Sequence, residues 1–158
     1  MAKLSIKGMD IFAKQLDTLA KDASKINRGA LGSGAGLVAD RIADALEKMP
    51  VRDDSTEHRL YGATESEKAQ IIDNFGIAKF RTSGGKTDTS IGFHGYVETP
   101  SKRFNNQVPT GMLMQCINYG TEFRRGTHTV DGAIKAVKNE VGKKMQDYID
   151  TEVGKIMK

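Results

Sequence analysis

The chain has 158 residues, of which 38% are hydrophobic and 6% aromatic, and its formal net charge is +4. The 24 basic residues are interspersed with 20 acidic ones, which excludes a one-signed nucleic-acid-binding tail, and the single cysteine, Cys116, excludes an intrachain disulfide. No stretch approaches the ~20 apolar residues of a membrane span or resembles a signal peptide, so we expect one soluble domain over residues 1–158, made in a reducing cytoplasm.

Two apolar stripes with helical spacing fill most of the segment before Pro50. After a short extended lead-in at residues 4–6, Asp10 is expected to cap a helix with the apolar residues Phe12, Leu16, Leu19, Ala23 and Ile26. Pro50 ends the second stripe because proline excludes the α conformation from the preceding residue; this stripe comprises Leu31, Ala35, Val38, Ile42, Ala45, Leu46 and Met49.

Four glycines lie where the two stripes meet. They do not match a dinucleotide-binding fingerprint, because the sixth place counted from Gly32 is Leu37. A glycine inside a helix is unfavourable unless it serves packing or bending. We therefore expect close helix packing or a bend near residues 27–36, where the glycines are Gly29, Gly32, Gly34 and Gly36.

The middle of the chain combines long polar stretches with short structured ones. Residues 51–62 show no periodicity and predict a flexible loop or arm, in which Asp53, Asp54 and Glu57 are expected to be solvated. Thr64 and Glu67 have the spacing of a capping box, which predicts a short helix through Ile71 and Ile72 closed by Gly76.

A β-hairpin is predicted around Ser83-Gly84-Gly85-Lys86, because apolar and polar residues alternate on both sides, over 77–82 and 87–93. Gly85-Lys86-Thr87 is not the end of a phosphate-binding loop, since Phe80 stands where that motif needs a glycine. The polar residues 97–109, which carry Lys102 and Arg103, predict a second flexible loop or arm.

The last third of the chain contains two further predicted helices. Thr110 is expected to cap a short one over 111–118, with Leu113, Cys116 and Ile117 buried and Gly120 ending it. A long amphipathic helix over most of 131–157 is predicted from the stripe of Ile134, Val137, Val141, Met145, Tyr148, Ile149, Val153 and Ile156.

No complete catalytic or metal-binding set is visible. The three histidines, His58, His94 and His128, are more than thirty residues apart, and none has a carboxylate or cysteine at ligand spacing. Cys116 has no histidine near it in the sequence, so we expect a buried and inert thiol. The chain is therefore expected to be no enzyme and to use no cofactor, metal or small-molecule substrate.

The order of several short motifs resembles the HK97-type tail-component family of long-tailed phages and prophages. The motifs follow an opening amphipathic helix pair: Phe75-Gly76-Ile77 before the hairpin, Ile91-Gly92-Phe93-His94-Gly95-Tyr96 after it, and then the turn Tyr119-Gly120-Thr121. The family commonly continues with a Thr-Pro-Phe or Pro-Phe element, whereas this chain has Thr127-His128-Thr129-Val130.

The resemblance implies an α+β fold, with long amphipathic N- and C-terminal helices packed on a small antiparallel β-sheet with a central hairpin. It further implies a virion protein at the neck or tail end, assembled in the bacterial host cytoplasm. This protein would complete the tail or join head to tail as a homo-oligomeric ring, expected to be a hexamer. The implied partners are the tail tube, the tail terminator and the head connector, with passive contact to DNA in the lumen and no membrane.

Two other functions remain open at this point. The chain can instead be the tail terminator, or a basic DNA-binding module suggested by a sequence pI of about 9.1. Two dibasic pairs fit either a solvated face or contact with an acidic partner or DNA. The residues predicted to lie at a subunit interface are Tyr119, Gly120, Thr121, Glu122, Phe123, Arg124, Arg125, Lys102 and Arg103.

Overall fold

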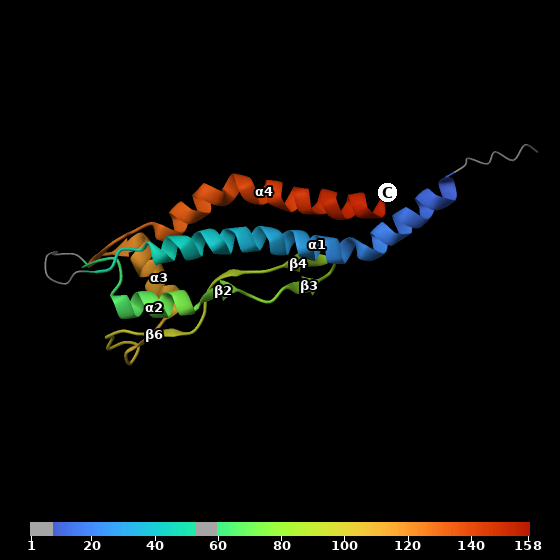
Figure 1. Cartoon of the computed structure of the whole chain (residues 1–158). Coiled ribbons are helices and arrows are strands. Elements are labelled where there is room, and N and C mark those ends of the chain that lie inside the picture. Colours follow the sequence, from blue (N-terminus) through green and yellow to red (C-terminus); the bar gives the residue numbers. More distant parts are fainter. Residues whose placement is uncertain (1–7, 53–59) are drawn as a thin grey trace, which may run out of the picture.

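The computed structural model describes residues 8–52 and 60–158, which form four helices and nine short strands. The predicted lead-in at 4–6, the acidic cluster at 53–57 and His58 lie outside these residues. The predicted fold class is confirmed, because long N- and C-terminal helices pack with small, mainly antiparallel β-sheets. The molecule is elongated, and its longest helix lies between the C-terminal helix and the β-hairpins (Figure 1).

The two long helices, α1 (Met9–Glu47) and α4 (Thr129–Ile156), form the most extensive contact in the structure. The two predicted N-terminal segments fuse into the single helix α1, and two of its glycines lie directly under side chains of α4. A Cβ atom added at Gly29 would lie 2.2 Å from the Tyr148 hydroxyl oxygen, and one added at Gly34 would lie 2.8 Å from Met145. Gly29 and Gly34 therefore serve close, antiparallel helix packing.

The N-terminal end of α1 differs from the prediction, whereas its C-terminal end agrees with it. Asp10 is not the cap, because the helix begins at Met9, after Gly8 in the left-handed conformation, and Asp10 lies in its first turn. An acidic side chain there still interacts favourably with the helix dipole. At the other end the helix stops before Pro50, as expected. Lys68 donates hydrogen bonds to the carbonyl oxygens of Glu47 (2.6 Å) and Met49 (2.9 Å) there.

Helix α2 (Glu65–Asp73) begins with the predicted capping box. The Thr64 side chain accepts from the Glu67 N–H at 3.1 Å, and the Glu67 carboxylate accepts from the Thr64 N–H at 3.0 Å. Gly76 does not close this helix. Asn74 does, because its side chain donates to the Tyr96 carbonyl and to the Thr110 hydroxyl, which turns the chain into the next strand.

The predicted hairpin is present, and its two arms pair in two separate segments. Strand β2 (Phe75–Ile77) pairs with β5 (Ile91–Phe93), and β3 (Arg81–Ser83) pairs with β4 (Lys86–Asp88). Gly84 and Gly85 have φ angles of 57° and 77°, the conformation that a two-residue hairpin turn requires.

Residues 97–109 are not a free arm. Strands β6 (Tyr96–Glu98) and β7 (Gln107–Pro109) pair there, with Val97 fully buried and Val108 8% exposed. Thr99 donates to the buried Glu67 carboxylate at 2.6 Å, which ties the hairpin to α2. Two apolar residues in an otherwise polar stretch are enough to anchor both strands, so only the turn between them projects outward.

The described ends of the predicted loop at 51–62 are also paired. Strand β1 (Leu60–Tyr61) lies parallel to β9 (Arg124–Arg125), which is antiparallel to β8 (Gly120–Thr121), and Val51 forms an isolated bridge with Ala63. These contacts between distant segments were not predicted, because strands of two residues carry no periodicity.

Helix α3 (Thr110–Tyr119) crosses the core beneath α1. Pro109, not Thr110, is its N-cap residue, and Thr110 is fully buried as the partner of Asn74. Met114 is buried in place of Cys116, which is half-buried. In α4, Ala133 and Val137 face the core, and Ile134 is 43% exposed. The core cluster comprises Ile42, Leu46, Met49, Ala63, Ile71, Val97, Val108, Leu113, Met114, Ile117 and Ala133.

Candidate subunit interface

The predicted interface segment forms a tight β-hairpin between α3 and α4. Gly120 has a φ of 85°, and a Cβ atom added there would lie 2.7 Å from the Arg124 carbonyl oxygen. The close approach of the two strands therefore requires glycine at this position. The Thr127 N–H then donates to the Ile117 carbonyl at 2.9 Å, which closes the loop and brings the chain back to the end of α3.

A buried asparagine holds the start of α4 against the end of α3. Asn118 is 3% exposed; its side-chain oxygen accepts from the Val130 N–H at 2.9 Å and its backbone carbonyl from the His128 N–H at 2.9 Å. His128 has a φ of 53°, which the proline ring, fixed near −65°, cannot adopt. A proline at position 128 would therefore not fit the path of the chain.

Two aromatic side chains are open to solvent here: Tyr119, the last residue of α3, and Phe123 in the hairpin turn. Phe123 is 71% exposed and Tyr119 is 61% exposed, although the Tyr119 hydroxyl donates to the Asp131 carboxylate at 3.0 Å. This hydrogen bond and the negative charge of Asp131 raise the pKa of the Tyr119 phenol. Thr121 and Glu122, at the tip, are also exposed. These four residues are therefore available to a partner.

Arg124 is not available to a partner. Its side chain is only 9% exposed and its guanidinium donates a hydrogen bond to the Gly62 carbonyl oxygen, so it joins the hairpin to the segment before α2. Burial lowers the pKa of this guanidinium, while nearby Glu67 acts in the opposite direction. Sequence reasoning missed this role, because a dibasic pair does not show which of its members is buried.

Arg125 is exposed and lies over the Tyr61 ring, with its guanidinium carbon 5.5 Å from the ring centre. With Arg124 buried, the pair presents one cation rather than two. Only one of the two dibasic pairs is thus fully exposed, which weakens the argument for a DNA-binding module.

Lys102 and Arg103 occupy a different hairpin. Both are exposed on the turn between β6 and β7, where the Arg103 guanidinium lies 5.3 Å from the centre of the Phe104 ring. The nine predicted interface residues therefore fall on two separate hairpins: seven in 119–125 and two on this turn.

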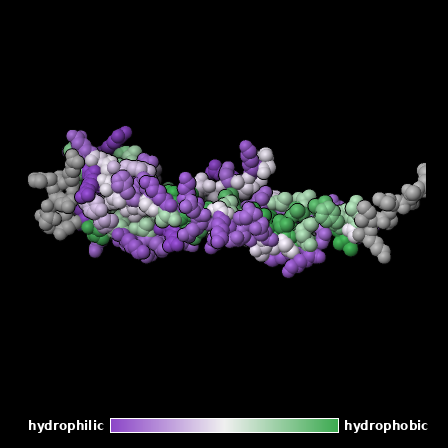
Figure 2. Space-filling view, turned by 90° about the horizontal axis from the view of Figure 1, so that it is seen from above, coloured by the Kyte–Doolittle hydropathy of each residue, from purple (hydrophilic) through white to green (hydrophobic). Residues whose placement is uncertain are grey.

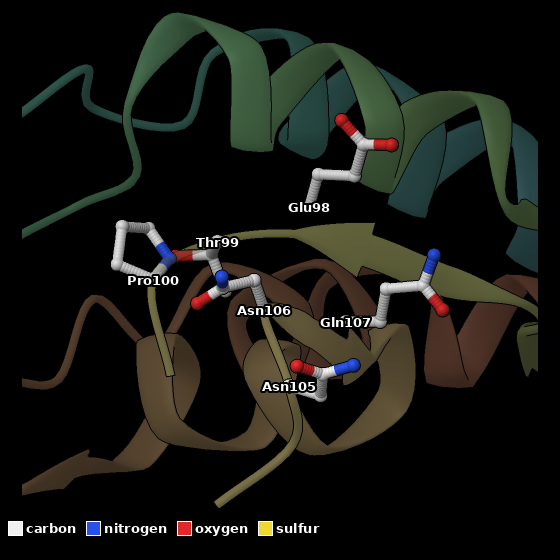
Figure 3. Close-up of a pocket in the computed structure, with 6 residues that line it drawn as sticks. All are labelled: Glu98, Thr99, Pro100, Asn105, Asn106 and Gln107. Atoms are coloured by element: carbon white, nitrogen blue, oxygen red, sulfur yellow. The ribbon is translucent and has the colours of Figure 1, made fainter. Parts of the chain in front are cut away.

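A polar surface hollow lies beside the β6–β7 turn, as Figure 3 shows. The side chains that line it point in different directions instead of converging on one point, unlike those of a typical ligand pocket. The lining residues are Glu98, Thr99, Pro100, Asn105, Asn106 and Gln107.

A smaller, more apolar groove lies next to Tyr119 and was not predicted. It runs between β5, α3 and the first turn of α4, and it has a volume of about 240 Å³. Gly92 lines one side of it, where an added Cβ atom would meet no atom within 4 Å. The groove is suited to an apolar side chain of a partner; its lining includes Ile91, Phe93, Met114, Tyr119 and Val130.

Among the described residues, no three His, Cys, Asp or Glu side chains are grouped so that they could hold a metal ion. Within 8–52 and 60–158, no helix is both long and apolar enough to cross a membrane.

Comparisons of the chain with protein-family models, with curated proteins and with solved structures found no match.

Proposed function

We propose that this chain is a structural virion protein of a tailed phage, prophage or phage-tail-like particle. In this proposal it acts at the neck, in tail completion or head–tail joining, by assembling into a ring. The observation that carries the proposal is a pair of exposed aromatic residues: Phe123 on the hairpin, and Tyr119 at the end of α3, where it lines an apolar groove. Exposed aromatic residues next to grooves are typical anchors of protein interfaces.

Hydrogen bonds from buried side chains hold the hairpin in place, and this lowers the entropy cost of binding a partner. Arg124 holds it to the Gly62 carbonyl, and Asn118 holds the chain that follows it. A rigid hairpin loses little conformational entropy when it meets a partner, so more of the contact energy is left for affinity. The order of the phage-like sequence motifs supports the same class of function.

Ring formation requires that one surface of a subunit meets a different surface of the next. In the proposed ring, expected to be hexameric by resemblance, the Phe123 hairpin is one of these surfaces. The ring's two faces then contact the tail tube or its terminator on one side and the head connector on the other. Exposed cations such as Arg125, Lys102 and Arg103 are suited to passive contact with DNA in the lumen.

Replacing Phe123 tests the proposal. We expect wild-type protein to form rings in negative-stain images and light scattering and to join tails, whereas Phe123→Ser should form no rings and keep an unchanged circular dichroism spectrum. Tyr96→Ser is the matched control, because Tyr96 is 64% exposed on a different hairpin, and it should leave rings intact. A wild-type protein that never forms rings or joins tails would refute the proposal.

Deleting the gene separates the two roles within assembly. Tails of normal length that fail to join heads are expected for tail completion. Overlong tail tubes would instead identify the chain as the tail terminator.

A further inference from the structure

The N-terminal part of α1 extends beyond the end of α4 (Figure 1). Gly34 of α1 lies against Met145 of the antiparallel α4. From Met145, α4 continues to its end at Ile156, and the equal length of α1 runs from Gly34 back to Ala23. Residues 9–22 therefore have no part of α4 beside them. We call this segment, about 20 Å long at 1.5 Å per residue, the α1 overhang.

The α1 overhang carries an apolar stripe that α4 does not cover. Met9 is 58% exposed, Phe12 48% and Leu16 44%, and Leu19 completes the stripe. Figure 2 shows this apolar surface at the overhang end of the molecule, next to the largely hydrophilic surface of the rest. Side chains of this size are normally covered when they lie in a row on one helix face.

The stripe of the overhang continues the one that packs under α4. Its residues follow alternating three- and four-residue steps from Met9 through Ala23 to Ile26 and Ala30, which are 7% and 1% exposed. This spacing is that of an antiparallel or parallel helix pair with a shared apolar seam. The covering element missing from the overhang is therefore another helix of about four turns.

The residues beside the apolar seam indicate which kind of helix can cover it. On one side they are Ala13 and Ala20, and on the other Gln15 and Asp22. Alanines let two helices approach closely, and no pair of like charges faces a second copy across the seam when the two helices run antiparallel. Three of these four residues are uncharged, so a second copy of the overhang can approach the seam without opposing like charges.

We propose that two copies of this chain pair through their α1 overhangs as an antiparallel helix pair. The partner's overhang then begins beside the end of α4 and runs in the same direction as α4. The positive N-terminal end of the partner's α1 then lies next to the negative C-terminal end of α4, which adds to the apolar contact. Both exposed stripes are covered at once, so the contact closes as a dimer.

The contact is small. Two paired helices of this length bury on the order of 1,000 Å² in total, slightly below the ~1,200 Å² at which stable interfaces begin. We therefore expect a dimer with a micromolar dissociation constant that forms and dissociates with protein concentration. This pairing is separate from the ring contact at Phe123, and neither depends on the other.

Sedimentation equilibrium of the full chain tests the pairing. We expect the Phe123→Ser chain, in which the ring contact is removed, to pass from monomer to dimer as its concentration rises through the micromolar range. Leu16→Glu should shift this transition at least tenfold upward, because it places a charge in the seam. Thr18→Glu adds the same charge outside the seam and should leave the transition unchanged. Because residue 16 lies outside the core, both variants should unfold at the wild-type temperature.

The orientation is tested with spin labels at position 10, in a chain whose Cys116 is replaced by serine. An antiparallel pair places the two labels near opposite ends of the paired segment, about 20 Å apart along the axis. A parallel pair places them side by side. Three results would overturn the proposal: a monomer at all concentrations, a dimer unaffected by Leu16→Glu, or short label distances. Wild-type monomers that bind anionic lipid vesicles instead would assign the stripe to a membrane surface and also overturn it. Phe123→Ser should dimerise normally, which separates this contact from the ring.

Discussion

Two glycines of α1 provide a matched test of the packing between α1 and α4. Gly29→Ala and Gly36→Ala both replace a glycine inside the same helix, and each should gain up to about 1 kcal/mol of helix stability. At Gly36 an added Cβ atom would meet no atom within 4 Å, so this gain should be realised. At Gly29 the same atom would lie 2.2 Å from the Tyr148 hydroxyl oxygen and 2.5 Å from its Cζ atom, so the ring must move.

Overfilling a packed contact costs about 1–3 kcal/mol, which is more than the gain in helix stability. We therefore expect Gly29→Ala to lower the free energy of unfolding by about 1 kcal/mol and Gly36→Ala to raise it by nearly as much. The two variants should then differ by roughly 5 °C in Tm for a chain of this size, measured by thermal unfolding with circular dichroism.

A second substitution identifies the cause. In a Tyr148→Ala background the ring is gone, so Gly29→Ala should become stabilising and the double-mutant cycle should give a coupling of about 2 kcal/mol. If Gly29→Ala is as stabilising as Gly36→Ala in the wild-type background, α4 does not pack on Gly29 and the reasoning is refuted.

Three further substitutions test local contacts. Asn118→Ala removes the acceptor of the Val130 N–H and should cost about 1–3 kcal/mol of stability, with faster amide exchange at Val130; unchanged exchange would contradict the contact. Thr64→Ala should cost about 1 kcal/mol in urea unfolding, whereas Thr64→Ser should keep the capping box. The Tyr119 pKa is raised above 10.0, so its hydrogen bond to Asp131 is complete below that pH and is lost as the pH rises through the folded-state pKa. Tyr119→Phe should remove the corresponding phenolate absorbance change, and Asp131→Asn should move it to lower pH.

Features encoded by neighbouring residues were predicted from the sequence. The capping box at Thr64 and Glu67 and the hairpin turn at Gly84 and Gly85 are present as expected, because each depends on residues within a few positions of one another. The helical stripes were also correct, since a period of three to four residues is visible in a single chain. The expected apolar position at Ile134 was wrong, because the neighbouring Ala133 faces the core instead.

Features that depend on distant residues were not predicted. Arg124 was expected at the surface, but Gly62, sixty-two positions earlier in the chain, supplies the carbonyl that receives its hydrogen bond. Residues 97–109 were expected to be an arm, because the contact of Thr99 with Glu67 across thirty-two positions leaves no trace in the sequence pattern. In both cases a polar residue is buried by a partner that only the fold brings near.

The predicted interface segment also combines a local feature that was predicted with an exposure pattern that was not. The sequence predicted that Gly120 ends the preceding helix within the turn Tyr119-Gly120-Thr121, and its positive φ angle agrees with this. Which of the segment's side chains face solvent was decided by the tertiary structure, which exposes Phe123 and buries Arg124.

The sequence by itself determined the helices and the hairpin, because these arise from local periodicity and turn chemistry. The α+β class was implied by the resemblance and is confirmed by the structure. Only the tertiary structure decided that α4 stops short of the end of α1. The apolar stripe of α1 is uniform along its length, so the sequence could not distinguish Ile26, covered by α4, from Phe12, left open. Exposure depends on where the partner helix ends, and that is a property of the packed molecule.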